Sequence, residues 1–275
     1  MIDVGELFRL SWTQFKLKWK VIATATLFLY LIPSIITSLL LLQLTLELET
    51  AKEFSFEILV NHFPEFTIAM VLGISAYLIY FPTIIIILQS KKGTFLQMLQ
   101  KGIGRVKYEL TATIVIFVLY GAILLLILAL VVVGIIIATT VKGFIGILLA
   151  AIWILIVIAI LAVVVFYWGT KIGLTHIVAI AQEKHGITAL RDAYLMSDGH
   201  WLSLIVGFSL AGVGSIVINA PVSILTFAVQ EFAQTTAVTI LTVSILSSIA
   251  YCISLPFGFI VTYFTYDLIK RIKKE

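Results

Sequence analysis

Six uncharged apolar segments, each long enough to cross a bilayer as a helix, constrain this chain more than any other feature. They span residues 21–46, 66–89, 110–141, 144–170, 202–229 and 237–266. A hydrocarbon core about 30 Å thick needs roughly 20 consecutive apolar residues in a helix. The apolar residues are continuous and do not alternate, which argues against membrane β-strands. The sequence therefore predicts an all-α integral membrane protein with six transmembrane helices.

The composition agrees with this prediction and excludes several classes of site. Only 12% of the 275 residues are charged and 61% are hydrophobic, against about 25% and 45–50% in ordinary globular chains. The first apolar segment is too long for a cleaved signal peptide. Cys252 is the only cysteine, so a disulfide within the chain and a cysteine metal cluster are excluded. We expect no metal, no cofactor and no nucleic acid.

The basic residues predict the orientation. All but Lys52 and Lys142 of the 18 lysines and arginines fall in four segments that six spans would place on one side, residues 1–20, 90–109, 171–201 and 267–275. Cytoplasmic loops carry the positive excess. We therefore expect a multipass protein of a prokaryotic plasma membrane, with both termini in the cytoplasm and anionic lipid headgroups as partners at that face.

An internal repeat organises the chain. Gln-x-Lys-x-Gly occurs at Gln89 and again 93 residues later at Gln182, and an aromatic residue, Tyr108 or Trp201, follows each glycine by fifteen residues. A weaker copy opens the chain. The sequence predicts one membrane domain of three helical hairpins, each preceded by a cytoplasmic interfacial amphipathic helix, in units of approximately 1–89, 90–182 and 183–275.

The first of these amphipathic segments carries an aromatic stripe. Phe8, Trp12, Phe15 and Trp19 recur at i, i+4, i+7 and i+11 and so share one helix face. Basic residues follow the same period one position later, a pattern typical of helices that lie among headgroups. Packing of the aromatics on neighbouring spans is an equal alternative. Further interfacial anchors are expected at Tyr108, Trp168 and Trp201.

Four prolines lie inside the predicted outer spans, at Pro33, Pro82, Pro221 and Pro256. Membrane helices tolerate proline when nearby groups satisfy the freed carbonyl. We expect kinks there, which either line a cavity or serve packing alone. Asn219, two residues before Pro221, would bind a headgroup or stabilise the kink.

Two registers are open for Lys171 and His176. Alignment of the repeats places both inside the membrane, where ionisable groups are usually functional. Counting from the loop at Gly143 places them at the cytoplasmic border, with span four continuing as a helix toward Gln182. On that register Gly186 would end the helix, as Gly93 would in the second unit.

Residues 176–201 (HIVAIAQEKHGITALRDAYLMSDGHW), with the opening stretch 7–20 and the closing stretch 255–268, resemble the membrane domain of bacterial and archaeal glycerophosphoryl diester phosphodiesterases and its stand-alone relatives. The resemblance implies six spans, cytoplasmic termini and no settled activity. The catalytic barrel of the fused members has no room in this sequence, so phosphodiesterase activity is not expected.

The function stays open between two classes. Ionisable residues gather at Glu183, His185, Asp198 and His200, and an imidazole with a carboxylate would suit acid–base chemistry of a membrane-bound enzyme. No HExxH motif, phosphate-binding glycine loop or zinc spacing accompanies them. We favour a non-enzymatic protein that binds, organises or passes lipid-like or small amphipathic molecules, with a membrane protein or a second copy of the chain as a further partner.

The charge distribution makes the topology testable. A reporter fused after Glu275 is expected in the cytoplasm, and one inserted near Lys52 is expected outside, because positive residues stay on the cytoplasmic side. Alkaline phosphatase and green fluorescent protein fusions would measure this. Either reporter on the opposite side would contradict six spans.

Overall fold

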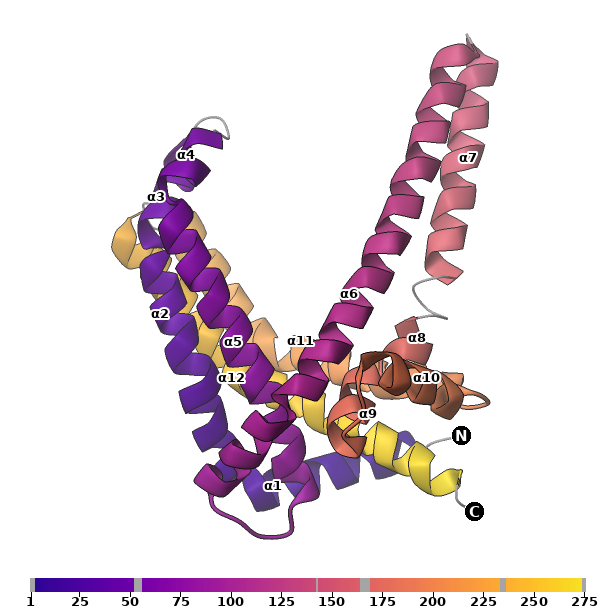
Figure 1. The fold of residues 1–275 in the computed structure, drawn as a ribbon. Helices are drawn as coiled ribbons and strands as arrows, with labels where there is room; N and C mark the ends of the chain where they lie inside the picture. Colours follow the sequence, from indigo (N-terminus) through magenta and orange to yellow (C-terminus); the bar gives the residue numbers. More distant parts are fainter. Residues whose placement is uncertain (1–2, 52–55, 142, 164–168, 233–235, 274–275) are drawn as a thin grey trace. The chain divides into compact units, whose positions relative to one another are not determined.

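The computed structural model describes residues 3–51, 56–141, 143–163, 169–232 and 236–273, and these are helical with no β-strand. Five helical stretches are long and apolar enough to cross a membrane: Val4–Leu40, Phe63–Gln89, Phe95–Ile136, Trp201–Val229 and Ala237–Ile272. The all-helical, multispan prediction is therefore confirmed at this level (Figure 1). The remaining expected span, residues 144–170, begins with α7 (Phe144–Val163), and its residues 164–168 are outside the described part.

The helices form two compact units. Unit A comprises residues 2–106 and 206–268, and unit B comprises residues 107–205 and 269–275. Unit A contains α1 (Val4–Thr26), a π-helical turn (Leu27–Leu31), α2 (Ile32–Leu40), α3 (Leu42–Thr50), α4 (Phe56–Asn61), α5 (Phe63–Gln89), the start of α6 (Phe95–Thr140) and most of α11 (Trp201–Phe232) and α12 (Ala237–Ile272). Unit B contains the rest of α6, α7, α8 (Gly169–Ile172), α9 (Thr175–Gln182) and α10 (Gly186–Ser197).

The second half of α5 is the core of unit A. Residues 80–88 are nine consecutive buried positions, so this stretch is covered on every side. A helix that is apolar all round needs such cover. α1 and α2 both pack against α5, and the Thr26 hydroxyl lies 3.0 Å from the Tyr80 hydroxyl.

The Pro33 kink has a clear local cause. Proline has no N–H to donate to the preceding turn, and the helix widens into a π-helical turn immediately before it, where the Ile32 N–H donates to the Leu27 carbonyl. Figure 1 shows the chain changing direction between α1 and α2 at this turn. The helices α5, α11 and α12 continue through Pro82, Pro221 and Pro256.

α11 and α12 approach closely in unit A through small residues. A methyl group on Gly207 would meet the Thr265 side chain, and one on Gly214 would meet the Phe257 ring. Small residues permit such contact between membrane helices. The Asn219 amide donates to Ser254 Oγ at 3.0 Å, and Ser34 Oγ of α2 lies 2.8 Å from Ser248 Oγ of α12.

At two places where the sequence predicts a break between helices, the described residues form no such break. The second amphipathic segment is not a separate helix, because α6 runs without interruption from Phe95 into the expected span three. Its sequence between these parts, residues 102–110, contains no proline, and its two glycines do not stop it. The first amphipathic segment likewise continues into the first span, through the π-helical turn.

The expected continuation of span four as one helix to Gln182, and the expected end of that helix at Gly186, are also wrong. The helix is interrupted at Gly173–Leu174, between α8 and α9, so no continuous helix reaches Gln182. α9 is ended by Glu183, whose φ of 57° is left-handed, and Gly186 begins α10. Gly186 is needed for a different reason: a side chain there would collide with the Thr111 carbonyl. α5 ends at Gln89, so Gly93 does not end it.

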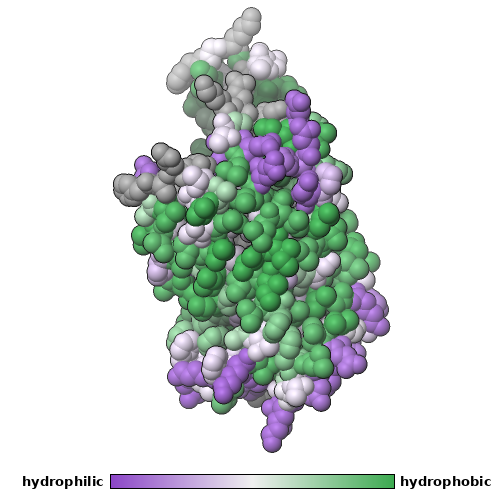
Figure 2. All heavy atoms as spheres, turned by 90° about the vertical axis from the view of Figure 1, so that its left-hand side faces the viewer, coloured by the Kyte–Doolittle hydropathy of each residue, from purple (hydrophilic) through white to green (hydrophobic). Residues whose placement is uncertain are grey.

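The surface agrees with a membrane environment. Figure 2 shows a broad hydrophobic area with hydrophilic residues gathered toward its two ends. Large apolar side chains along α5, such as Ile68, Val71 and Ile74, are more than half exposed. Soluble monomers rarely expose apolar patches beyond a few hundred Å². By length and composition, the chain is a multipass helical membrane protein.

The contact between α6 and α5 yields a prediction with a matched control. A methyl group on Gly102 would lie 3.0 Å from the Cα of Thr83 and closer still to its hydroxyl, whereas Gly104 has open space. Gly102→Ala is expected to lower the free energy of unfolding by about 1–3 kcal/mol through overpacking. Gly104→Ala is expected to be neutral or to raise it by up to about 1 kcal/mol. Thermal unfolding in one detergent would compare them, and equal effects would refute the close contact.

Candidate functional site

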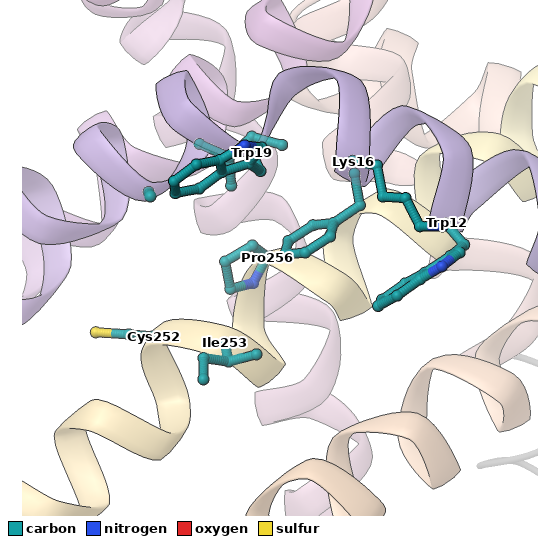
Figure 3. A pocket seen from close by; sticks show the side chains of 9 residues that line it. Trp12, Lys16, Trp19, Cys252, Ile253 and Pro256 are labelled. Atoms are coloured by element: carbon teal, nitrogen blue, oxygen red, sulfur yellow. The ribbon is translucent and has the colours of Figure 1, made fainter.

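A pocket of about 580 Å³ lies between α1 and α12 in unit A. Its lining is formed by Trp12, Phe15, Lys16, Trp19, Ile22, Ala23, Cys252, Ile253 and Pro256. Figure 3 shows the Pro256 ring between the two indoles. Ile22 and Pro256 are buried, while Trp12 and Trp19 are 41% and 53% exposed. The pocket is therefore closed at its base and reaches the surface at the indoles.

The predicted aromatic stripe forms one wall of this pocket. Because the stripe residues recur at helical spacing, they lie along one face of α1, and the first three of them stack. The rings of Phe8 and Trp12 are 6.4 Å apart and nearly parallel, and those of Trp12 and Phe15 are 5.7 Å apart. Phe8 also meets Phe257 of α12 edge-on at 6.4 Å. Part of the stripe thus packs on a neighbouring helix, which is one of the two predicted alternatives. The two indoles are exposed, so a lipid or ligand can reach them.

The pocket is apolar with one charged group. The Lys16 ammonium lies 5.4 Å from the centre of the Trp12 ring, within the range of a cation–π contact. Cys252, the single cysteine of the chain, contributes a half-exposed thiol. A mostly apolar pocket with few polar groups is the usual form of a small-molecule site, and its volume falls in the customary range of roughly 300–1,000 Å³. This lining suits the binding of a small molecule. It contains no carboxylate or imidazole that could act in acid–base chemistry.

In unit B the structure brings together Lys171 and Asp198, two predicted candidates. The Lys171 ammonium donates to Asp198 Oδ1 at 2.9 Å and lies 4.1 Å from the centre of the Tyr194 ring. The Lys171 side chain is 5% exposed and that of Asp198 is 63% exposed. The hydrogen bond from Lys171 and its charge lower the pKa of the Asp198 carboxyl below its ordinary value. Lys171 is thus buried in protein and paired.

His176 contacts a carboxyl group that sequence reasoning missed. Its Nδ1 lies 2.8 Å from Oε1 of Glu109, whose side chain is completely buried. The Thr113 hydroxyl is 3.4 Å from the same oxygen, and Glu109 Oε2 has no hydrogen-bond partner among the described residues. One signal could have revealed Glu109: no other Asp or Glu occurs between Glu65 and Glu183.

The other ionisable candidates do not assemble into one site. Glu183 forms the left-handed turn after α9. The exposed His185 ring packs 4.9 Å from the Tyr108 ring, and the Lys184 ammonium pairs with Asp192. His200 lies in the turn before α11, where its N–H donates to the Ser197 carbonyl at 3.0 Å. The described residues contain no group of three or more His, Cys, Asp or Glu side chains suited to a metal.

The remaining predicted anchors lie within α6, at the start of α11 and outside the described part. Tyr108 is covered by the Lys107 ammonium at 4.9 Å from its ring centre. Trp201 is the first residue of α11 and is 42% exposed. Trp168 lies outside the described residues. Asn219 donates to Ser254 of α12, a contact between two helices that the sequence did not predict.

Comparisons with known proteins give no relative from which to infer a role. No protein-family model, no curated protein and no solved structure matches the chain.

The two lysine–aspartate pairs of unit B allow a matched test. Asp198→Asn is expected to lower the melting temperature more than Asp192→Asn does. The reason is exposure: losing Asp198 leaves the buried ammonium of Lys171 without its carboxylate, whereas the Lys184 side chain is 37% exposed and is solvated. Thermal unfolding at pH 7 would measure both variants, and an equal or smaller loss for Asp198→Asn would contradict a structural role.

The same pair has a defined pH dependence. Because the folded-state pKa of Asp198 lies below 3.8, its stabilising contribution is complete above about pH 4 and is lost as the pH falls through the lowered pKa. Wild type and Asp198→Asn should therefore converge in melting temperature only in that acid range. Convergence near neutral pH would contradict the pairing.

Proposed function

We propose that this membrane protein binds small amphipathic, lipid-like molecules in the pocket between α1 and α12 and does not transform them. The observation that carries the proposal is the pocket itself, about 580 Å³ of space between the aromatic stripe of α1, in which Trp12 and Phe15 stack, and the proline-containing helix α12. Hydrophobic lining removes an acyl chain from contact with water or headgroups, a transfer that contributes about 0.8 kcal/mol per buried methylene.

The location of the pocket suits this role. Trp12 and Trp19 belong to a segment in which aromatic residues alternate with lysines, a composition favoured at the membrane–water interface. We propose that α1 lies at the cytoplasmic interface of a prokaryotic plasma membrane, with anionic headgroups around it. A molecule in the pocket would then have its polar end near the headgroups and its chain among the apolar side chains.

The proposal includes the complete topology. Six spans in three hairpins, cytoplasmic termini and interfacial amphipathic segments are supported by the charge distribution and by the resemblance to the membrane domain of glycerophosphoryl diester phosphodiesterases. That resemblance supplies no activity. We give less weight to a membrane-bound enzyme at Glu183, His185, Asp198 and His200, because the partners found for Asp198 and His185 are Lys171 and Tyr108.

The single cysteine makes binding measurable in the unmodified chain. Monoolein, a neutral single-chain amphiphile, is expected to slow the reaction of Cys252 with N-ethylmaleimide in protein reconstituted in phosphatidylcholine nanodiscs. Labelling would fall by the factor 1 + [ligand]/Kd, which is about tenfold at a concentration near ten times Kd. Intact-protein mass spectrometry would follow the adduct.

Two tryptophan variants separate binding from a general effect on the membrane. Ala23→Trp fills the pocket and should abolish protection by monoolein. Leu17→Trp adds the same side chain at a position of α1 that is 72% exposed and does not line the pocket, so protection should persist. Equal protection in both variants, or none in wild type, would refute the proposed site.

A further inference from the structure

The position of Lys16 defines which amphiphile the pocket would prefer. Of the nine lining residues only Lys16 carries a charge, and eight are apolar or, in the case of Cys252, weakly polar. A ligand headgroup in this pocket therefore meets one cation and no anion. This charge pattern favours a negatively charged headgroup over a neutral or positively charged one.

The ammonium of Lys16 is available to such a headgroup. It is exposed, and among the described residues no carboxylate lies within ion-pair distance of it. Its contact is the face of the Trp12 ring at 5.4 Å. An ammonium has three N–H donors, and a ring face uses them only weakly, so donors remain for the oxygens of an acid.

A neighbouring lysine shows that this arrangement is specific to Lys16. Lys18, two residues on, points to another side of α1 and donates to the carbonyls of Ile87, Leu88 and Ser90 at 2.9, 2.7 and 2.9 Å. All three of its donors are thus used within the protein. Lys20 is exposed and does not line the pocket. Of these three lysines of α1, Lys16 alone both lines the apolar pocket and has an ammonium without an ion pair among the described residues.

The size of the pocket limits the apolar part of the ligand. A volume of about 580 Å³ is that of a site for a molecule of drug size, which suits one acyl chain better than the two chains of a phospholipid. From charge and size together, and resting on the proposed binding function, we infer that the pocket takes a single-chain amphiphile with a carboxylate headgroup, such as a fatty acid, and that Lys16 binds the carboxylate.

The test compares two ligands that share a chain and differ in the headgroup. Oleate and monoolein would be titrated against N-ethylmaleimide labelling of Cys252 in phosphatidylcholine nanodiscs, with free concentrations corrected for partition into the bilayer. Oleate is expected to bind about two- to fivefold more tightly, the range of a partly exposed ion pair. The difference should shrink in 1 M salt, which screens exposed charges.

Two charge variants identify the group that is responsible. Lys16→Gln should abolish the preference, so that oleate and monoolein bind this variant with equal Kd. Lys20→Gln, one turn along the same exposed helix, should leave the preference intact. Because both side chains are exposed, neither change is expected to affect folding, and equal melting temperatures would verify this.

The outcomes separate this inference from the proposed function. Equal protection by both ligands, or a preference for oleate that survives Lys16→Gln, overturns the carboxylate site and leaves the pocket as a neutral binding site. Protection by neither ligand overturns the proposed function as well. Preference for oleate that is lost only in Lys16→Gln supports the inference.

Discussion

The contact of the Lys18 ammonium with the end of α5 is the interaction on which unit A depends. The last carbonyls of a helix have no partner within it, and near a membrane each one needs a donor from the protein. Lys18 supplies three donors to the carbonyls of Ile87, Leu88 and Ser90. Because α5 is buried all round just before this point, the contact fixes α1 against the core of the unit.

Fixing α1 through Lys18 leaves a different face of the helix for the pocket. Trp12, Phe15 and Trp19 lie on that face and line the pocket. The rings of Trp12 and Phe15 stack, and Pro256 of α12 stands opposite. For part of the aromatic stripe, the structure shows packing on a neighbouring helix, which is one of the two alternatives that the sequence presented. Phe8 packs against α12, whereas the indoles remain at the surface of the pocket.

Polar contacts connect segments of unit B that are distant in the sequence. Lys171 is buried beside Asp198 and Tyr194, and Glu109 is buried beside His176. Such pairs add little net stability but are costly to break, because the remaining partner stays desolvated. They connect α6 at Glu109 with α9 at His176, and α8 at Lys171 with the turn after α10.

The sequence by itself determined the helical membrane class of the protein, the approximate positions of its long apolar helices and the membership of the aromatic stripe. Continuous apolar segments admit only helices in lipid, since every backbone N–H and C=O must bond within the segment, and a period near 3.6 assigns residues to a face. Only the tertiary structure decided that the stripe faces α12, that Glu109 meets His176 across 67 positions, and that Glu183 instead of Gly186 ends α9. Hydrophobic continuity is the same on every side of a helix, so it does not specify which helices pack together. That choice depends on contacts between distant residues, and these exist only in the folded chain.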